Sequence, residues 1–124
     1  MIKQNFVIIC ESAIIEKDSN NLYLLGIFEN IITPKLPAIH PKFAVVTSFE
    51  GGSDEYDHKI VIRHEDGSEA AKLEGKIKFS ENQKAQYIGR FIGFPFTKPG
   101  KYTFEIYLNE NMQPLTSSLN IREE

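Results

Sequence analysis

Apolar and polar residues alternate over many short stretches of the chain, which is the pattern of β-strands with one buried face. The alternation is clearest over residues 72–79, where Leu73, Ile77 and Phe79 share one face and charged side chains share the other. No stretch keeps a helical apolar period over three turns, so helix is limited to one short turn over residues 80–85. Eight strands are predicted, over residues 6–15, 22–29, 43–50, 57–64, 72–79, 86–96, 100–109 and 115–121.

Turn-forming residues separate these strands. The pair Asp66-Gly67 is a strong hairpin signal between two alternating segments. Residues 33–41 carry three prolines, which argue against helix or a central strand there and predict a crossing between two sheets. Ile31 and Ile32 read as an extension of the second strand, and Gly26 inside that strand predicts a bulge or a close packing contact.

Seven or eight short strands in one domain, residues 1–124, predict an all-β sandwich or barrel. Residues 97–104 resemble the tyrosine corner of immunoglobulin-like sandwiches, in which a tyrosine hydroxyl bonds back to the backbone a few residues upstream. Pro99, Gly100 and Tyr102 would form this corner. Phe104 stands where antibody domains carry a cysteine, and the chain has no tryptophan. The predicted fold is therefore an immunoglobulin-like β-sandwich of seven or eight antiparallel strands, outside the antibody type.

Charge and cysteine content narrow the partners and the compartment. The net charge is −3 and the lysines and arginines are spread singly, which argues against nucleic acid or an anionic membrane as a partner. No segment approaches the roughly 20 apolar residues of a membrane helix. The single cysteine, Cys10, rules out a disulfide within the chain and favours a reducing, cytoplasmic location.

Two acidic and histidine-bearing clusters are candidates for metal binding. Residues 54–58 contain Asp57 and His58, and residues 64–66 contain His64. The clusters lie at opposite ends of one predicted strand, about 20 Å apart at the rise of an extended chain, so they cannot share an ion. Asp57 and His58 also point to opposite faces of that strand. We therefore predict no metal and no cofactor.

The sequence also lacks a convincing catalytic arrangement. Cys10 paired with His40, His58 or His64 is the one nucleophile candidate, but Cys10 lies among apolar neighbours and reads as a buried small side chain. No nucleophile elbow or phosphate-binding loop is present. We therefore predict that the protein is not an enzyme.

Residues 86–96 are apolar on both faces near their end, which a two-layer sandwich does not require. One interpretation is an interface formed by Ile88, Ile92, Phe94 and Phe96, or else by Tyr87 and Phe91. The alternative is that a loop or the N-terminal segment covers these side chains.

Several short stretches spread over most of the chain share one pattern of apolar residues and turns: residues 9–11, 23–28, 37–41, 60–62 with 66–67, and 99–108 followed by Leu115. In these stretches the chain resembles a family of uncharacterised small bacterial proteins, described as a domain of unknown function. The resemblance implies an immunoglobulin-like sandwich without an assigned activity, and it supplies no catalytic residues.

Three functions follow from these patterns. The leading one is a non-enzymatic protein-interaction or assembly module that uses a sheet edge or an apolar sheet face, with a homodimer as its simplest version. The second is a sandwich that binds a small ligand or a carbohydrate. The carbohydrate site would use exposed tyrosines, for which the candidates are Tyr23, Tyr56, Tyr87 and Tyr107. The third function is a metal-assisted hydrolase built on the acidic loop and His58.

Overall fold

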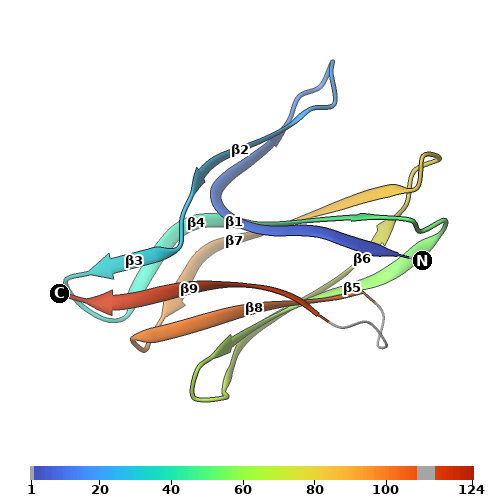
Figure 1. Cartoon of the computed structure of the whole chain (residues 1–124). Helices are drawn as coiled ribbons and strands as arrows, with labels where there is room; N and C mark the ends of the chain where they lie inside the picture. Colours follow the sequence, from blue (N-terminus) through green and yellow to red (C-terminus); the bar gives the residue numbers. More distant parts are fainter. Residues whose placement is uncertain (1, 109–113) are drawn as a thin grey trace.

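The computed structural model describes residues 2–108 and 114–124, and over these residues the chain forms nine strands and no helix. The strands lie in two layers with the two ends of the chain at opposite ends of the molecule (Figure 1). No helix long and apolar enough to cross a membrane occurs in this part of the chain. The strands are β1 (Lys3–Ile15), β2 (Leu22–Ile27), β3 (Asn30–Thr33), β4 (Ala38–Glu50), β5 (Glu55–His64), β6 (Glu69–Lys78), β7 (Lys84–Phe96), β8 (Gly100–Leu108) and β9 (Leu115–Glu123).

The strands form two sheets that pack face to face, which confirms the predicted all-β sandwich. Sheet A has four strands in the order β2-β1-β4-β7, and sheet B has five in the order β3-β9-β8-β5-β6. The ladders between these strands are antiparallel except for β3 with β9, which run parallel. The Asp66-Gly67 hairpin joins β5 to β6 as predicted, and Gly67 has a positive φ of 93°.

The prediction of seven or eight antiparallel strands needs two corrections: the described residues form nine strands, and one pair, β3 with β9, is parallel. Ile31 and Ile32 do not extend β2; they belong to the separate strand β3, which pairs with β9 in the other sheet. The chain changes sheets at Phe28 and Glu29, where the Phe28 N–H donates to Ile9 and the Glu29 carbonyl accepts from Asn120. The apolar run hid this break, because Phe28 packs against the core like a strand residue.

The proline-bearing crossing is shorter than predicted, since β4 already begins at Ala38 and includes Pro41. Pro41 lacks an N–H, but β1 pairs with β4 only as far as Ala44. Beyond that point β4 has a neighbour on one side only, β7, so a proline there leaves no ladder hydrogen bond unmade on the free side.

Aromatic rings fill the space between the sheets. Phe43 of β4 is 1 % exposed and stacks on Phe91 of β7 with ring centroids 4.9 Å apart. Phe104 of β8 meets Phe43 edge-on from the opposite sheet at 6.1 Å. Apolar burial of this kind is the dominant stabilising contribution to folding, and aromatic pairs in these geometries add to it.

The outer faces of the two sheets differ in polarity. On sheet B, the Arg63 guanidinium contacts both carboxylate oxygens of Glu105, and the Tyr107 hydroxyl donates to the same carboxylate at 3.0 Å. Lys59 lies over the Tyr107 ring, with Nζ 4.9 Å from its centroid. Burial and the neighbouring Glu105 raise the pKa of Tyr107. The outer face of sheet A instead carries an apolar cluster among its polar side chains, and this cluster leads to the candidate site.

Candidate functional site

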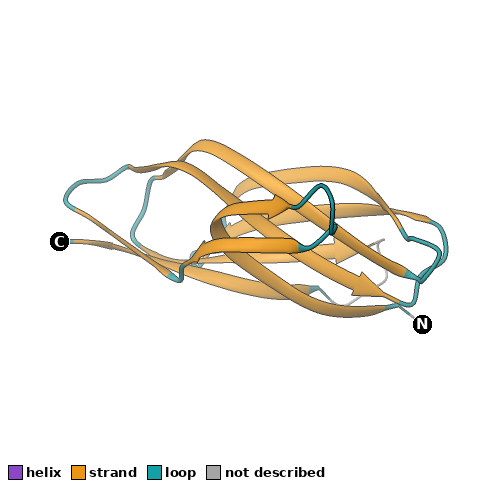
Figure 2. Ribbon diagram, turned by 90° about the horizontal axis from the view of Figure 1, so that it is seen from above, coloured by secondary structure: helices purple, strands orange, loops and turns teal. Residues whose placement is uncertain are grey.

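The β1–β2 hairpin folds back over the outer face of its own sheet. Figure 1 shows the hairpin rising from sheet A, and Figure 2 shows it from above, lying across the strands beneath it. We call residues 11–26 the arm. The bend lies between the pairs Cys10–Ile27 and Ser12–Leu25, at the position of Glu11 and Gly26.

Gly26 makes this bend feasible. Its φ is +70°, a left-handed conformation that glycine adopts without steric cost. A Cβ at this position would also lie 3.0 Å from Cγ of Glu11, closer than ordinary packing allows. The bend changes which side chains face inward. Cys10 and Ala13 belong to the same buried cluster, although an odd separation of three positions would place them on opposite faces of a regular strand.

The inner surface of the arm packs on an apolar cluster on the outer face of sheet A. Cys10, Ala44 and Val46 are at most 2 % exposed there, although they do not face the space between the sheets. Leu24 of the arm and Ile88 of β7 pack against this cluster and are partly buried. The structure therefore supports the alternative in which the N-terminal segment covers part of the doubly apolar region.

A hydrogen bond ties the arm to the edge of sheet A. The Arg90 Nη2 of β7 donates to the carbonyl oxygen of Ala13 at 3.2 Å. The arm is thus held by the apolar contacts of Ala13, Leu22 and Leu24 and by a charged donor from a strand two positions away in the sheet.

The outer surface of the arm is apolar and exposed. Ile14 and Tyr23 lie opposite each other, and Leu25 follows two residues after Tyr23, so all three share one side. Their exposed fractions are 47 %, 46 % and 52 %. Ile27, at the base of the arm, is 61 % exposed. We call Ile14, Tyr23 and Leu25 the arm face. Exposed apolar side chains gathered in this way are typical of a binding surface.

The structure separates the residues of the predicted β7 interface. Phe96 is fully buried in the core and Phe94 packs against the core, whereas Ile92 is 87 % exposed. Ile88 lies beneath the arm. Tyr87 and Phe91, the other proposed set, face the core. The reason is a positive φ of 64° at Gly93, across which the inward-facing residues change from odd to even positions. Sequence alternation alone could not reveal this change.

The first candidate metal cluster is split by the sheet. His58 is 1 % exposed and its Nε2 lies 3.1 Å from Thr47 Oγ1, whereas the Asp57 side chain is 81 % exposed. The His58 ring stacks on Tyr87 at 4.1 Å between centroids. Burial lowers the pKa of His58 to about 4, so the ring is neutral at neutral pH. In the described ranges, no three His, Cys, Asp or Glu side chains are placed to hold a metal ion.

Cys10 is buried, as predicted. Its Sγ donates to the Ser12 carbonyl oxygen at 3.3 Å, and burial raises the pKa of the thiol. A raised pKa leaves less thiolate, the form that acts as a nucleophile.

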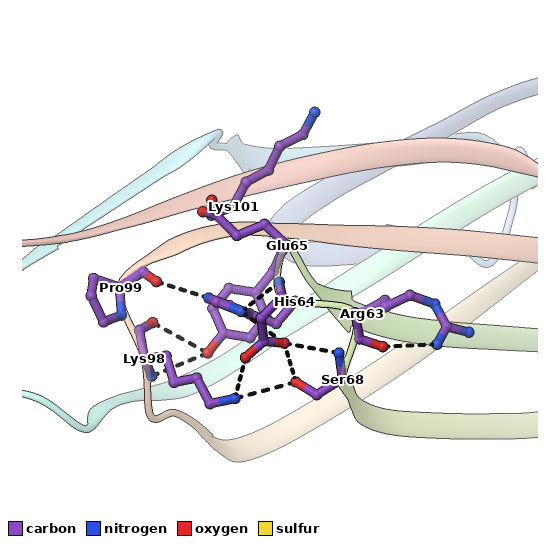
Figure 3. A network of polar contacts seen from close by, with 10 residues as sticks. Arg63, His64, Glu65, Ser68, Lys98, Pro99 and Lys101 are labelled. Atoms are coloured by element: carbon purple, nitrogen blue, oxygen red, sulfur yellow. Dashed lines mark hydrogen bonds and ion pairs between the residues drawn. The ribbon is translucent and has the colours of Figure 1, made fainter.

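The second acidic cluster belongs to the corner between the β5–β6 and β7–β8 turns (Figure 3). His64 Nε2 donates to the Pro99 carbonyl at 2.8 Å, because its Nδ1 accepts the Asp66 N–H at 3.1 Å. Glu65 accepts the Lys101 N–H at 2.6 Å. The ion pair with Lys98, followed by hydrogen bonds from Ser68, lowers the pKa of Asp66. These groups satisfy one another, so the cluster reads as a structural corner.

Tyr102 makes the contact that the tyrosine-corner resemblance predicts. Its hydroxyl donates to the Lys98 carbonyl and accepts the Lys98 N–H, both at 3.2 Å. Gly100 beside it has a φ of +114°, and a Cβ there would overlap the Glu65 carboxylate, so this position requires glycine.

Replacing Tyr102 by phenylalanine is expected to lower the free energy of unfolding by about 1–2 kcal/mol, because two backbone hydrogen bonds are lost at a residue that is 2 % exposed. Urea unfolding followed by circular dichroism measures the change. Tyr23→Phe is the matched control, since the Tyr23 hydroxyl is at the surface, and it should change stability by less than about 0.5 kcal/mol. Equal effects of the two variants would contradict the corner assignment.

The tyrosines proposed as carbohydrate platforms do not gather in one place. Tyr23 lies on the arm face, Tyr87 stacks on His58 in the core, and Tyr107 is covered by Lys59 on the outer face of sheet B. Tyr56 meets Phe79 edge-on at 5.4 Å. An open depression of about 430 Å³ lies elsewhere, and its lining contains no tyrosine: Asn30, Ile32, Asn120 and Arg122.

Comparison with known proteins gives a match at the level of a family. A family model described as a family of unknown function (DUF6941) matches residues 5–122. A search of curated proteins finds no match. The family match agrees with the resemblance to an uncharacterised family seen in the sequence.

Proposed function

The chain belongs to the DUF6941 family of unknown function, and we propose that it is a non-enzymatic protein-interaction module that binds through the arm face. The observation that carries the proposal is the exposure of Ile14, Tyr23 and Leu25 on a hairpin whose other side is packed down. A hairpin held in this way presents apolar side chains in a fixed arrangement, which lowers the entropic cost of binding.

The other surfaces support this choice. The outer face of sheet B is covered by charged and hydrogen-bonded side chains, and the acidic clusters are divided or internally satisfied. Aromatic residues such as Tyr23 are enriched at protein interfaces because they combine a large apolar area with a polar end. The arm face therefore fits a protein partner better than a small polar ligand.

The proposal also includes a fold class and a compartment. We propose that the sandwich belongs to the immunoglobulin-like class, which the hydrogen bonds between Tyr102 and Lys98 at the corner support. A cytoplasmic location is supported by the buried free thiol of Cys10.

The proposal predicts that a partner captured from source cells depends on Leu25. We expect Leu25→Lys to lose at least about 90 % of a captured protein, because a lysine at the centre of an apolar contact costs more than 1.4 kcal/mol, or tenfold in affinity. The measurement is quantitative mass spectrometry of proteins retained on the immobilised full chain. Ile92→Lys is the matched control, since Ile92 is an exposed isoleucine on β7 outside the arm. Proteins retained equally by the wild type and Leu25→Lys would show that the arm face is not the binding surface.

A further inference from the structure

The four edge strands of the sandwich differ in how they discourage pairing with another strand. In sheet B, five of the ten residues of β6 are charged, and β3 has only four residues before Pro34. In sheet A, β7 carries Lys84 and Arg90, a positive φ at Gly93, and Pro95. Charges, prolines, bulges and short length are the devices by which natural edge strands avoid unwanted pairing.

The remaining edge strand, β2, carries neither charges nor prolines. Its sequence is Leu-Tyr-Leu-Leu-Gly-Ile, without a charged residue or a proline over six residues. The bend at Gly26 falls near its end, so residues 22–25 form a continuous edge. One side of β2 pairs with β1, and among the described strands no other pairs with it. The N–H and C=O groups along its outer edge are therefore free to accept an added strand.

We propose that β2 pairs with β2 of a second copy of this chain, in antiparallel orientation about a two-fold axis. This inference rests on the proposed function, because the second copy binds the arm itself, at the edge of the strand that carries Tyr23 and Leu25 of the arm face. The added strand has to be extended and uncharged, and it has to have an edge that is not already paired with another strand. The strand β2 meets these requirements, and two identical uncharged strands bring no like charges together.

Symmetry then places the two arm faces on the same side of the joined sheet. In an antiparallel pair, residues directly opposite each other share a face, and a two-fold axis at Leu24 sets Tyr23 opposite Leu25 of the second copy. The exposed side chains of both arms thus form one apolar surface. Pairing at this edge also joins the two arms, each of two strands, into one four-stranded ribbon.

The test is the solution mass of the full chain, measured by light scattering after size exclusion over a range of concentrations. We expect the wild type to form a dimer, and both Leu25→Lys and Tyr23→Lys to raise the dissociation constant of the dimer by at least about tenfold. Both positions are about half exposed, so a lysine can reach solvent in the folded monomer. Ile92→Lys should dimerise like the wild type. Circular dichroism confirms that each variant is folded.

Three results would overturn the inference. These are a monomer at every concentration, a dimer that survives both arm substitutions, and a mass that grows without limit instead of stopping at two chains. A monomeric wild type that still captures a different protein through Leu25 would leave the proposed function standing and remove only the second copy as the partner. A dimer lost in Ile92→Lys and kept in Leu25→Lys would place the interface on β7. It would contradict both the proposed function and the pairing through β2.

Discussion

Replacing Phe43 by alanine should lower the free energy of unfolding by about 3–5 kcal/mol, a large part of the stability of a domain of this size. Phe43 is 1 % exposed and lies where rings from both sheets meet. It stacks on Phe91 at 4.9 Å, and it approaches Phe96 and Phe104 at centroid distances of 6.0 and 6.1 Å. Truncation removes these contacts and leaves a cavity that the two sheets cannot close without shifting.

Urea unfolding at neutral pH measures this effect. Ile92→Ala is the matched control. Ile92 is also apolar and lies on β7, the strand next to the one that carries Phe43, but it is 87 % exposed. It should change stability by less than about 0.5 kcal/mol. A loss below about 1 kcal/mol for Phe43→Ala would mean that this aromatic cluster is not the centre of the core.

Acidification should destabilise the protein through His58 before the carboxylates titrate. Burial lowers the pKa of His58 to about 4 in the folded state, against a value near 6.5 in the unfolded chain. Between these values the unfolded state binds more protons, so stability is full above pH 6.5 and falls as the pH drops toward 4. The expected loss between pH 7 and pH 4.5 is on the order of 2–3 kcal/mol.

The surroundings of His58 explain the sign of this effect. Its Nε2 already contacts Thr47, and within the described part of the chain its buried Nδ1 has no hydrogen-bond partner. A proton added there would be neither hydrated nor paired. Asp66 affects stability at lower pH than His58 does. Its ion pair with Lys98 lowers its pKa, so the stability that the ionised carboxylate contributes is lost only as the pH falls below the pKa of an ordinary carboxyl group.

The double variant Thr47→Val with His58→Leu isolates the contribution of His58. Replacing both partners by apolar groups avoids leaving the Thr47 hydroxyl unpaired in the core. Urea unfolding at pH 7 and pH 4.5 should show a much smaller loss in this variant than in the wild type. The same loss in both proteins would assign the pH dependence to other groups.

The fold was predictable from the sequence to the extent that local patterns determine it. Period-two alternation located the segments that became β1, β2 and β4 to β9, and the Pro99-Gly100-Tyr102 motif marked the corner. The strand β3 was missed because Ile31 and Ile32 continue an apolar run. Pairing with β9, about ninety positions away, decides their sheet, and no local pattern encodes such a partner.

The candidate site was only partly predictable, and two glycines explain why. The sequence flagged Gly26 as a bulge, but the direction in which the arm bends depends on its positive φ and on the cluster at Ala44 and Val46. Alternation across Gly93 assigned Phe94 and Phe96 to a surface, while the backbone there turns both toward the core. A single inverted φ reverses which side chains face out, and sequence alternation does not register it.

The most direct test of the account is hydrogen exchange of the β2 amides, residues 22–27, in the full chain at low and high concentration. Edge pairing predicts that these amides become more protected as the concentration rises, while the amides of β6 and β7 do not change. The same experiment on Leu25→Lys should show no concentration dependence. Exchange of the β2 amides at one rate across all concentrations, or protection that appears at β7 instead, would contradict the claim that the arm is where this protein meets a second copy.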